Sequence, residues 1–249
     1  MSSTSEPIWI IPDTNILIGE LKSFIDILSR YRDRNIIIGI PQILVEEKSQ
    51  SLYTIVCGYQ KATNEFQKHL NEILSEFEKK HLQVEIVPII GVYGISRYGM
   101  SYYGGEKSKD FMTQTIQKYL DEKYIETPKY LEHCGLKIDQ RDYLELFYEG
   151  LSICCSLSDS ANESCRDQCE TLHGVLADIL ILSAVDYPYQ RGNKVIVVSN
   201  DKTMCKTANE LVKEEFFDEK YVKCVAMEGL EEILKKSFKL FKSINNEAR

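Results

Sequence analysis

The stretch Ile8-Trp9-Ile10-Ile11-Pro12-Asp13-Thr14-Asn15 decides the fold class of this chain. Its apolar residues predict a buried strand that ends just before Asp13. Thr14 and Asn15 favour a helix start, and the apolar spacing predicts a helix over residues 16–31. A carboxylate between a buried strand and a helix lies where open α/β sheets place their functional groups. The stretch therefore indicates an α/β fold with a candidate site at this strand end.

Short apolar stretches alternate with helical patterns along much of the remaining chain. Further buried strands are predicted over residues 36–40, 195–198 and 221–226, with another candidate over 84–90. Helices are predicted from Pro41 onward, over 59–81, over 203–215 and over 230–241. Such alternation implies a central parallel sheet with helices on both faces, so the expected fold class is α/β.

Residues 91–170 do not follow this alternation. Segments 111–124 and 139–148 have helical patterns, whereas 151–169 is polar and holds four cysteines. We therefore expect a single domain over residues 1–249, with a largely helical insertion at 91–170.

The composition limits the class of protein. The chain has 249 residues, 43% of them hydrophobic, which is enough for one large α/β domain. No apolar run approaches the ~20 residues that span a bilayer. The first seven residues lack the positive region of a secretory signal, so we expect an intracellular protein, nuclear or cytoplasmic, with eight reduced cysteines. The net charge of −8 argues against a protein that coats nucleic acid, but it is compatible with a nuclease that has an acidic site.

Other acids are expected near Asp13. Asp201 follows the strand predicted at 195–198, and the carboxyl ends of parallel strands share one edge of a sheet. Asp178 lies in an apolar helical run, where a lone carboxylate requires a partner or a metal.

Glu46 and Glu47 add further carboxylates in the helix expected from Pro41. Clustered carboxylates repel one another, and a hard divalent cation such as Mg²⁺ or Mn²⁺ relieves that repulsion. Such ions activate water and neutralise the charge on a reacting phosphoryl group. The acids together therefore predict metal-dependent phosphodiester hydrolysis.

Four acidic motifs carry a resemblance to a known family. In chain order they are Pro12-Asp13-Thr14-Asn15-Ile16-Leu17, Pro41-Gln42-Ile43-Leu44-Val45-Glu46-Glu47, Ala177-Asp178-Ile179-Leu180-Ile181-Leu182 and Val198-Ser199-Asn200-Asp201. They resemble the motifs of PIN-domain ribonucleases, most closely the eukaryotic PIN endonucleases of RNA surveillance. The matches cover residues 1–50 and 170–230, and the insertion takes no part in them.

The resemblance implies a three-layer α/β/α sandwich with a central parallel sheet. It also implies a metal-dependent endoribonuclease that uses Mg²⁺ or Mn²⁺. Its substrate would be single-stranded RNA, cleaved by water attack to leave 5′-phosphate and 3′-hydroxyl ends. Protein partners in an RNA-processing complex are implied as well, and no membrane.

The resemblance assigns roles to the four acids. Asp13 and Asp178 would bind the metal directly or through water, and Asp201 would share that metal or bind a second one. Glu47 would bind metal or orient the attacking water, because the family's second acid comes six residues after the strand-ending proline. A leucine usually follows that acid, whereas Lys48 follows it here.

Three polar residues would support the acids. Thr14 and Asn15 would hold Asp13 through hydroxyl, amide and backbone hydrogen bonds. Ser199 matches the hydroxyl residue that usually stands two positions before the last acid, Asp201.

Other interpretations of the same residues remain open. Asp13 and Asp201 could each be an ordinary helix N-cap. The fold could serve as a catalytically weak or inactive scaffold, or as an RNA-binding module in a larger complex. A 5′-flap DNA nuclease would also use similar acids, although a helical element that grips DNA is not evident in this sequence.

Two patterns in the insertion invite a functional reading. Residues 93–109 interleave tyrosines with cations, so Arg97, Tyr102, Tyr103 and Lys107 could stack on bases and hold phosphates. An ordinary loop with structural tyrosines explains the same pattern. A zinc site is the second candidate, and its potential ligands are Cys154, Cys155, Cys165, Cys169 and His173. Because no Cys-x-x-Cys spacing is present there, packing residues and reduced surface thiols are the favoured interpretation.

Overall fold

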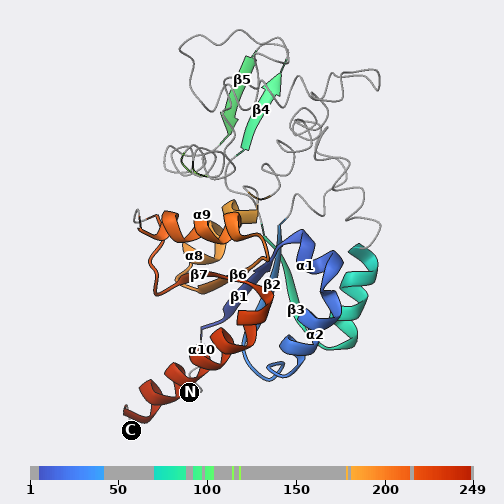
Figure 1. Cartoon of the computed structure of the whole chain (residues 1–249), viewed down its shortest axis with the longest axis vertical. Helices are drawn as coiled ribbons and strands as arrows, with labels where there is room; N and C mark the ends of the chain where they lie inside the picture. The colour runs from blue at the N-terminus through green and yellow to red at the C-terminus, as the bar shows by residue number, and fades with distance from the viewer. Residues whose placement is uncertain are drawn as a thin grey trace. The chain divides into compact units, whose positions relative to one another are not determined.

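The computed structural model describes residues 6–41, 70–87, 92–96, 99–103, 114, 118, 178, 181–213 and 216–247 (Figure 1). The chain divides into two compact units. The first contains residues 1–40, 69–86 and 188–249, and the second contains 41–68 and 87–187. The predicted insertion lies entirely in the second unit.

A five-stranded parallel sheet forms the centre of the first unit. Its strands are β1 (Ile8–Pro12), β2 (Ile36–Pro41), β3 (Gln83–Val87), β6 (Lys194–Val198) and β7 (Val222–Val225). All five predicted strands therefore form, and the expected α/β class with a parallel sheet is confirmed. The strand order is β3-β2-β1-β6-β7, so the chain moves outward from β1 on one side and from β6 on the other. The reversal of strand order falls between β1 and β6.

Burial explains the nearly continuous Ile and Val of the central strands. All residues of β1 and β2 are buried, as are the last four of β6. A strand covered on both faces has no solvent side, so the alternation of apolar and polar residues disappears. The edge strand β3 is more open, and its Ile86 is 43% exposed.

Helices connect these strands. The described helices include α1 (Thr14–Gly19), α2 (Leu21–Ser29), a helix over residues 70–79, α8 (Asp186–Tyr189), α9 (Lys202–Lys213) and α10 (Met227–Glu247). Residues 178 and 181–183 are helical as well. The helices predicted over 203–215 and 230–241 correspond to α9 and α10, and α10 is longer at both ends. No helix in the described ranges combines the length and apolar character needed to cross a membrane.

Two predicted helix boundaries are wrong. The helix expected over 16–31 is interrupted at Glu20, whose φ of −127° and ψ of 17° lie outside the helical region. Glu20 thus separates α1 from α2 and turns the chain. Pro41 does not begin a helix but is the last residue of β2, a position where a proline interrupts no interior ladder.

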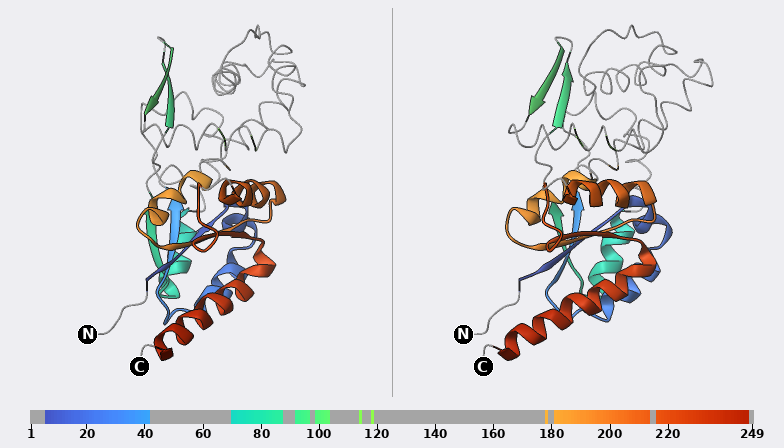
Figure 2. Two further views of the ribbon diagram at one scale, coloured as in Figure 1. Left: turned by 90° about the vertical axis from the view of Figure 1, so that its left-hand side faces the viewer. Right: turned by 60° about the vertical axis from the view of Figure 1, so that its left-hand side comes forward.

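Aromatic contacts join the helices of the first unit. Phe24 of α2 meets Phe77 edge to face, with ring centroids 6.2 Å apart, and both side chains are fully buried. Tyr31 stacks on Phe238 of α10 at 5.7 Å, and Arg34 lies over the same ring. Helices α2 and α10 therefore lie side by side (Figure 2).

The described part of the second unit includes an antiparallel hairpin. It is formed by β4 (Val92–Ser96) and β5 (Gly99–Tyr103), with Tyr93 opposite Tyr102. Residues 92–96 and 99–103, expected in a loop, are therefore strands, and their proposed contact with RNA stays a prediction. Residues with high strand propensity favour the hairpin, because Val92, Tyr93 and Ile95 lie in β4 and Tyr102 and Tyr103 lie in β5. Gln114 and Lys118 are helical, in agreement with the helix predicted over 111–124.

Candidate functional site

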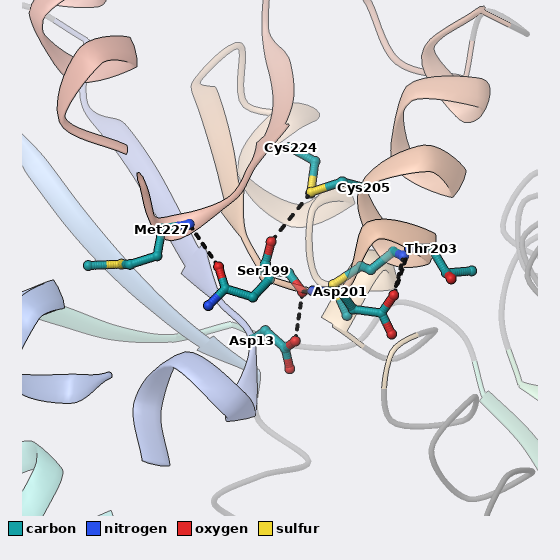
Figure 3. Close-up of a disulfide and its surroundings, with 9 residues drawn as sticks. Asp13, Ser199, Asp201, Thr203, Cys205, Cys224 and Met227 are labelled. Carbon is teal, nitrogen blue, oxygen red and sulfur yellow. Dashed lines mark hydrogen bonds between the residues drawn. A yellow bond between two sulfur atoms is a disulfide. The ribbon is translucent and has the colours of Figure 1, made fainter. Parts of the chain in front are cut away.

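The sheet brings the ends of β1 and β6 together. The two strands pair in parallel with Pro12 opposite Val198, so Asp13 and Ser199 occupy equivalent positions just beyond the strands. The backbone N–H of Asp13 donates to the Val198 carbonyl at 2.8 Å and extends the pairing by one bond. Figure 3 shows Asp13, Ser199 and Asp201 at this edge. It is the point where the strand order reverses, and open α/β sheets bind ligands at such points.

Asp13 is buried, with 1% of its surface exposed, and is surrounded by hydrogen-bond donors. Its Oδ1 accepts from the Thr14 hydroxyl at 3.1 Å and from the Asn15 backbone N–H at 3.4 Å. Its Oδ2 accepts from the Ser199 hydroxyl at 2.7 Å. The hydrogen bonds expected from Thr14 and Asn15 are thus present, and Asn15 uses its backbone. These donors offset the cost of burying the carboxylate, and Asp13 also caps α1.

Ser199 joins the two acids. Its hydroxyl donates to Asp13 and accepts from the backbone N–H of Asp201 at 3.0 Å. The side chain is buried, with 1% of the residue exposed. A single hydroxyl therefore fixes the orientation of one carboxylate and the backbone that carries the other, across 186 positions of sequence.

Asp201 is half-buried and caps α9. Its Oδ1 accepts from the backbone N–H groups of Thr203 at 2.6 Å and Met204 at 3.4 Å. Amides at the start of a helix favour negative charge, so this position stabilises an ionised carboxylate. The interpretation of Asp13 and Asp201 as helix caps is therefore borne out geometrically, and the caps place both acids at the same sheet edge.

Asn200 is a site residue that sequence reasoning missed. Its amide donates to the Glu20 carboxylate, and its Oδ1 accepts from the Met227 backbone N–H at 3.0 Å. The side chain thus links the break between α1 and α2 to the first residue of α10. Its place between two motif residues, Ser199 and Asp201, was the available signal. The sequence around Glu20 contains no comparable signal, because its partner Asn200 comes from a distant segment.

The other two predicted acids belong to the second unit. Glu47, with its neighbour Glu46, lies outside the described residues. Asp178 is helical and half-buried, as its apolar surroundings predicted, and belongs to the second unit.

The residues proposed for RNA and zinc lie in the second unit. Tyr102 and Tyr103 are in β5, whereas Arg97 and Lys107 fall outside the described residues. The five potential zinc ligands, Cys154, Cys155, Cys165, Cys169 and His173, also fall outside them.

One pair of cysteines contradicts the expectation of reduced thiols. Cys205 of α9 and Cys224 of β7 form a disulfide with an S–S distance of 2.04 Å. The two residues are 19 positions apart, and α9 packs on β7 so that their Cα atoms are 5.0 Å apart. The residues at the chain start, on which the expectation of reduced thiols rested, carry no information about this proximity.

The chemistry of the assembled donors suits a hard cation. Asp13 and Asp201 carry carboxylate oxygens, and the Ser199 hydroxyl contacts the Asp13 carboxylate and the Asp201 backbone. Mg²⁺ and Mn²⁺ prefer oxygen ligands. Within the part of the chain that the structure describes, no group of three or more His, Cys, Asp or Glu side chains could hold a metal ion. The pair therefore fits one side of a carboxylate site that needs further ligands.

Comparison of the chain with protein-family models, with curated proteins and with solved structures gives no match, so the fold and the site rest on sequence pattern and geometry.

Proposed function

We propose that this chain is a PIN-like domain with three α/β/α layers, acting as a Mg²⁺- or Mn²⁺-dependent endoribonuclease on single-stranded RNA. The observation that carries the proposal is the pair Asp13 and Asp201, connected through Ser199 at the reversal of strand order. The loops on the two sides of such a point diverge and leave room for a ligand. The two acids belong to the first and last of the four motifs.

In this proposal each described residue has a defined task. Thr14 and Ser199 hold the two oxygens of Asp13, so that the carboxylate needs no reorganisation when it binds a cation. The first amides of α9 hold Asp201 in the same way. Glu47 and Asp178 complete the proposed set of four acids. A divalent cation would supply charge neutralisation at the phosphoryl group and activation of the attacking water.

The proposed reaction is attack of water on phosphorus with departure of the 3′-oxygen. The products would carry a 5′-phosphate and a 3′-hydroxyl. A carboxylate edge suits this reaction because it would hold a divalent cation, and that cation would neutralise the anionic phosphodiester before water approaches.

A scaffold or RNA-binding module is the second candidate. The observation that favours it is that Asp13 and Asp201 both cap helices, which gives each acid a structural role without a metal. An acid that caps a helix still stabilises that helix when it binds no metal.

Cleavage of labelled single-stranded RNA in Mn²⁺ or Mg²⁺ tests the proposal. Wild type is compared with Asp13→Asn and Asp201→Asn, which keep the size of each side chain and an oxygen that accepts hydrogen bonds. We expect each variant to lose about 10²-fold or more in rate, because a ligand or charge-stabilising group is removed. The matched control is Asp26→Asn, at an exposed acid of α2, which should cleave as wild type does.

The two candidates give different results. Cleavage that survives both site substitutions would refute the nuclease site. RNA binding without cleavage in any metal would favour the scaffold. A 5′-phosphate on the downstream product would support the proposed direction of bond breakage.

A further inference from the structure

We propose that Cys205 and Cys224 are a redox modification site that changes between a dithiol and a disulfide. The disulfide restrains the first turn of α9 and thereby the position of Asp201. The effect on RNA cleavage rests on the proposed function, whereas the effect on α9 does not. The pair is separate from the acids, and its disulfide crosses from α9 to the edge strand β7 (Figure 3).

The location of Cys205 connects it to Asp201. Cys205 is the fourth residue of α9, and its backbone N–H donates to the Asp201 carbonyl at 3.2 Å. The two preceding amides, of Thr203 and Met204, hold the Asp201 carboxylate. A bond from Cys205 to β7 therefore restrains the turn whose amides hold one acid of the candidate site.

The Cys205 sulfur also contacts the residue that joins both acids. It lies 3.8 Å from the Ser199 carbonyl oxygen. A disulfide sulfur has no proton to donate, so this contact is a van der Waals contact in the oxidised protein. After reduction the Cys205 thiol can donate a weak S–H hydrogen bond to the same carbonyl. The two redox states therefore differ in a direct contact to Ser199.

The surroundings permit the bond to open and close. Both cysteines are half-buried, so a small thiol can reach them. Their Cα separation of 5.0 Å is within the roughly 4.4–6.8 Å of ordinary disulfides. Helix α9 stays packed through the buried Met204, Ala208 and Leu211, so the two thiols remain neighbours when the bond is broken.

The chemistry is a thiol–disulfide exchange with a low-molecular-weight disulfide such as glutathione disulfide. One cysteine thiolate attacks a sulfur of that reagent, forms a mixed disulfide and expels one glutathione thiolate. The second cysteine thiolate attacks the protein sulfur of the mixed disulfide and expels the other glutathione thiolate. The protein loses two electrons and two protons, and the reagent gains both as two thiols. Excess reduced thiol reverses the sequence.

The test compares the full chain after equilibration with glutathione disulfide or with dithiothreitol. Mass spectrometry of unreduced peptides establishes whether Cys205 and Cys224 are bonded. Amide hydrogen exchange then measures the protection of Thr203 and Met204. We expect exchange at these amides to be about ten-fold faster in the reduced protein, since local opening of the turn is no longer restrained. RNA cleavage should fall about three-fold or more on reduction, because the acid is less well positioned.

The double variant Cys205→Ser/Cys224→Ser is the control for the other six cysteines. It should behave as the reduced wild type does in both buffers. Redox dependence that persists in this variant would overturn the assignment to this pair. Unchanged exchange at Thr203 and Met204 after verified reduction would overturn the proposed effect on α9. A change in exchange without RNA cleavage in any state would keep the redox site and reject the nuclease.

Discussion

Replacement of Ser199 by alanine tests whether one buried hydroxyl holds the candidate site together. The hydroxyl donates to the Asp13 carboxylate at 2.7 Å and accepts from the Asp201 N–H at 3.0 Å, and Ser199 is 1% exposed. A hydrogen bond to a charged group contributes about 1.5–3 kcal/mol and a neutral one about 1 kcal/mol. Loss of both should therefore lower the free energy of unfolding by about 3 kcal/mol.

Urea unfolding followed by the fluorescence of Trp9 measures this change. Trp9 is the only tryptophan of the chain and is buried in β1, four residues before Asp13. With a urea dependence of about 2 kcal/mol per molar, the midpoint of Ser199→Ala should fall by about 1.5 M. The emission of Trp9 reports the strand that carries the acid, so the signal comes from the relevant unit.

Ser29 supplies the matched control. Its hydroxyl is buried at the end of α2, and no partner for it is found among the described residues. Ser29→Ala removes the same atom without removing a hydrogen bond and should leave the midpoint unchanged or slightly raised. If Ser199→Ala and Ser29→Ala have midpoints within about 0.3 M of each other, the inferred role of the Ser199 hydroxyl is refuted.

Three further predictions concern α9 and α10. Thr207→Val should raise the free energy of unfolding by about 1–2 kcal/mol, because Thr207 Oγ1 is buried without a hydrogen-bond partner among the described residues; a lower urea midpoint would contradict this. Asn200→Ala should increase exchange of the Met227 amide about five-fold, since that N–H loses its acceptor, and unchanged exchange would exclude the link. The hydrogen bond from Lys235, followed by that from Arg30, holds the pKa of Glu231 below its ordinary value of 4.5. A carboxyl group whose pKa is lower in the folded state stabilises the protein at pH values above its unfolded pKa, and this stabilisation is lost as the pH falls through the folded pKa. In a circular-dichroism titration from pH 6 to 3, Glu231→Gln should therefore lose less α10 helicity than wild type does.

The local sequence pattern was sufficient to predict the strands but not the boundaries of the helices. Continuous Ile and Val predicted β1, β2 and β6 because strands buried on both faces require them. The helix over 16–31 looked continuous because its apolar spacing is regular on both sides of Glu20. The spacing of apolar residues does not reveal the break at Glu20, nor that the Glu20 carboxylate accepts a hydrogen bond from Asn200 in another segment.

In the candidate site, too, some features were predictable from the local sequence and others were not. The positions of Asp13 and Asp201 near strand ends followed from the sequence, because Asp13 directly follows one apolar run and Asp201 stands three residues after another. The hydrogen bonds of Asp13 to its neighbours Thr14 and Asn15 were also predictable, since they are local. The hydrogen bond from the Met227 backbone N–H to Asn200 Oδ1 was not predictable, because it joins segments 27 positions apart.

The sequence by itself determined which residues form the central strands and which carboxylates stand at their ends. Both properties depend on a few consecutive residues, so periodicity and composition reveal them. Only the tertiary structure decided that β1 and β6 are neighbours, that Ser199 joins Asp13 to the backbone of Asp201, and that Cys205 reaches Cys224. Those contacts join residues up to 186 positions apart, and their partners are chosen by the packing of the whole unit.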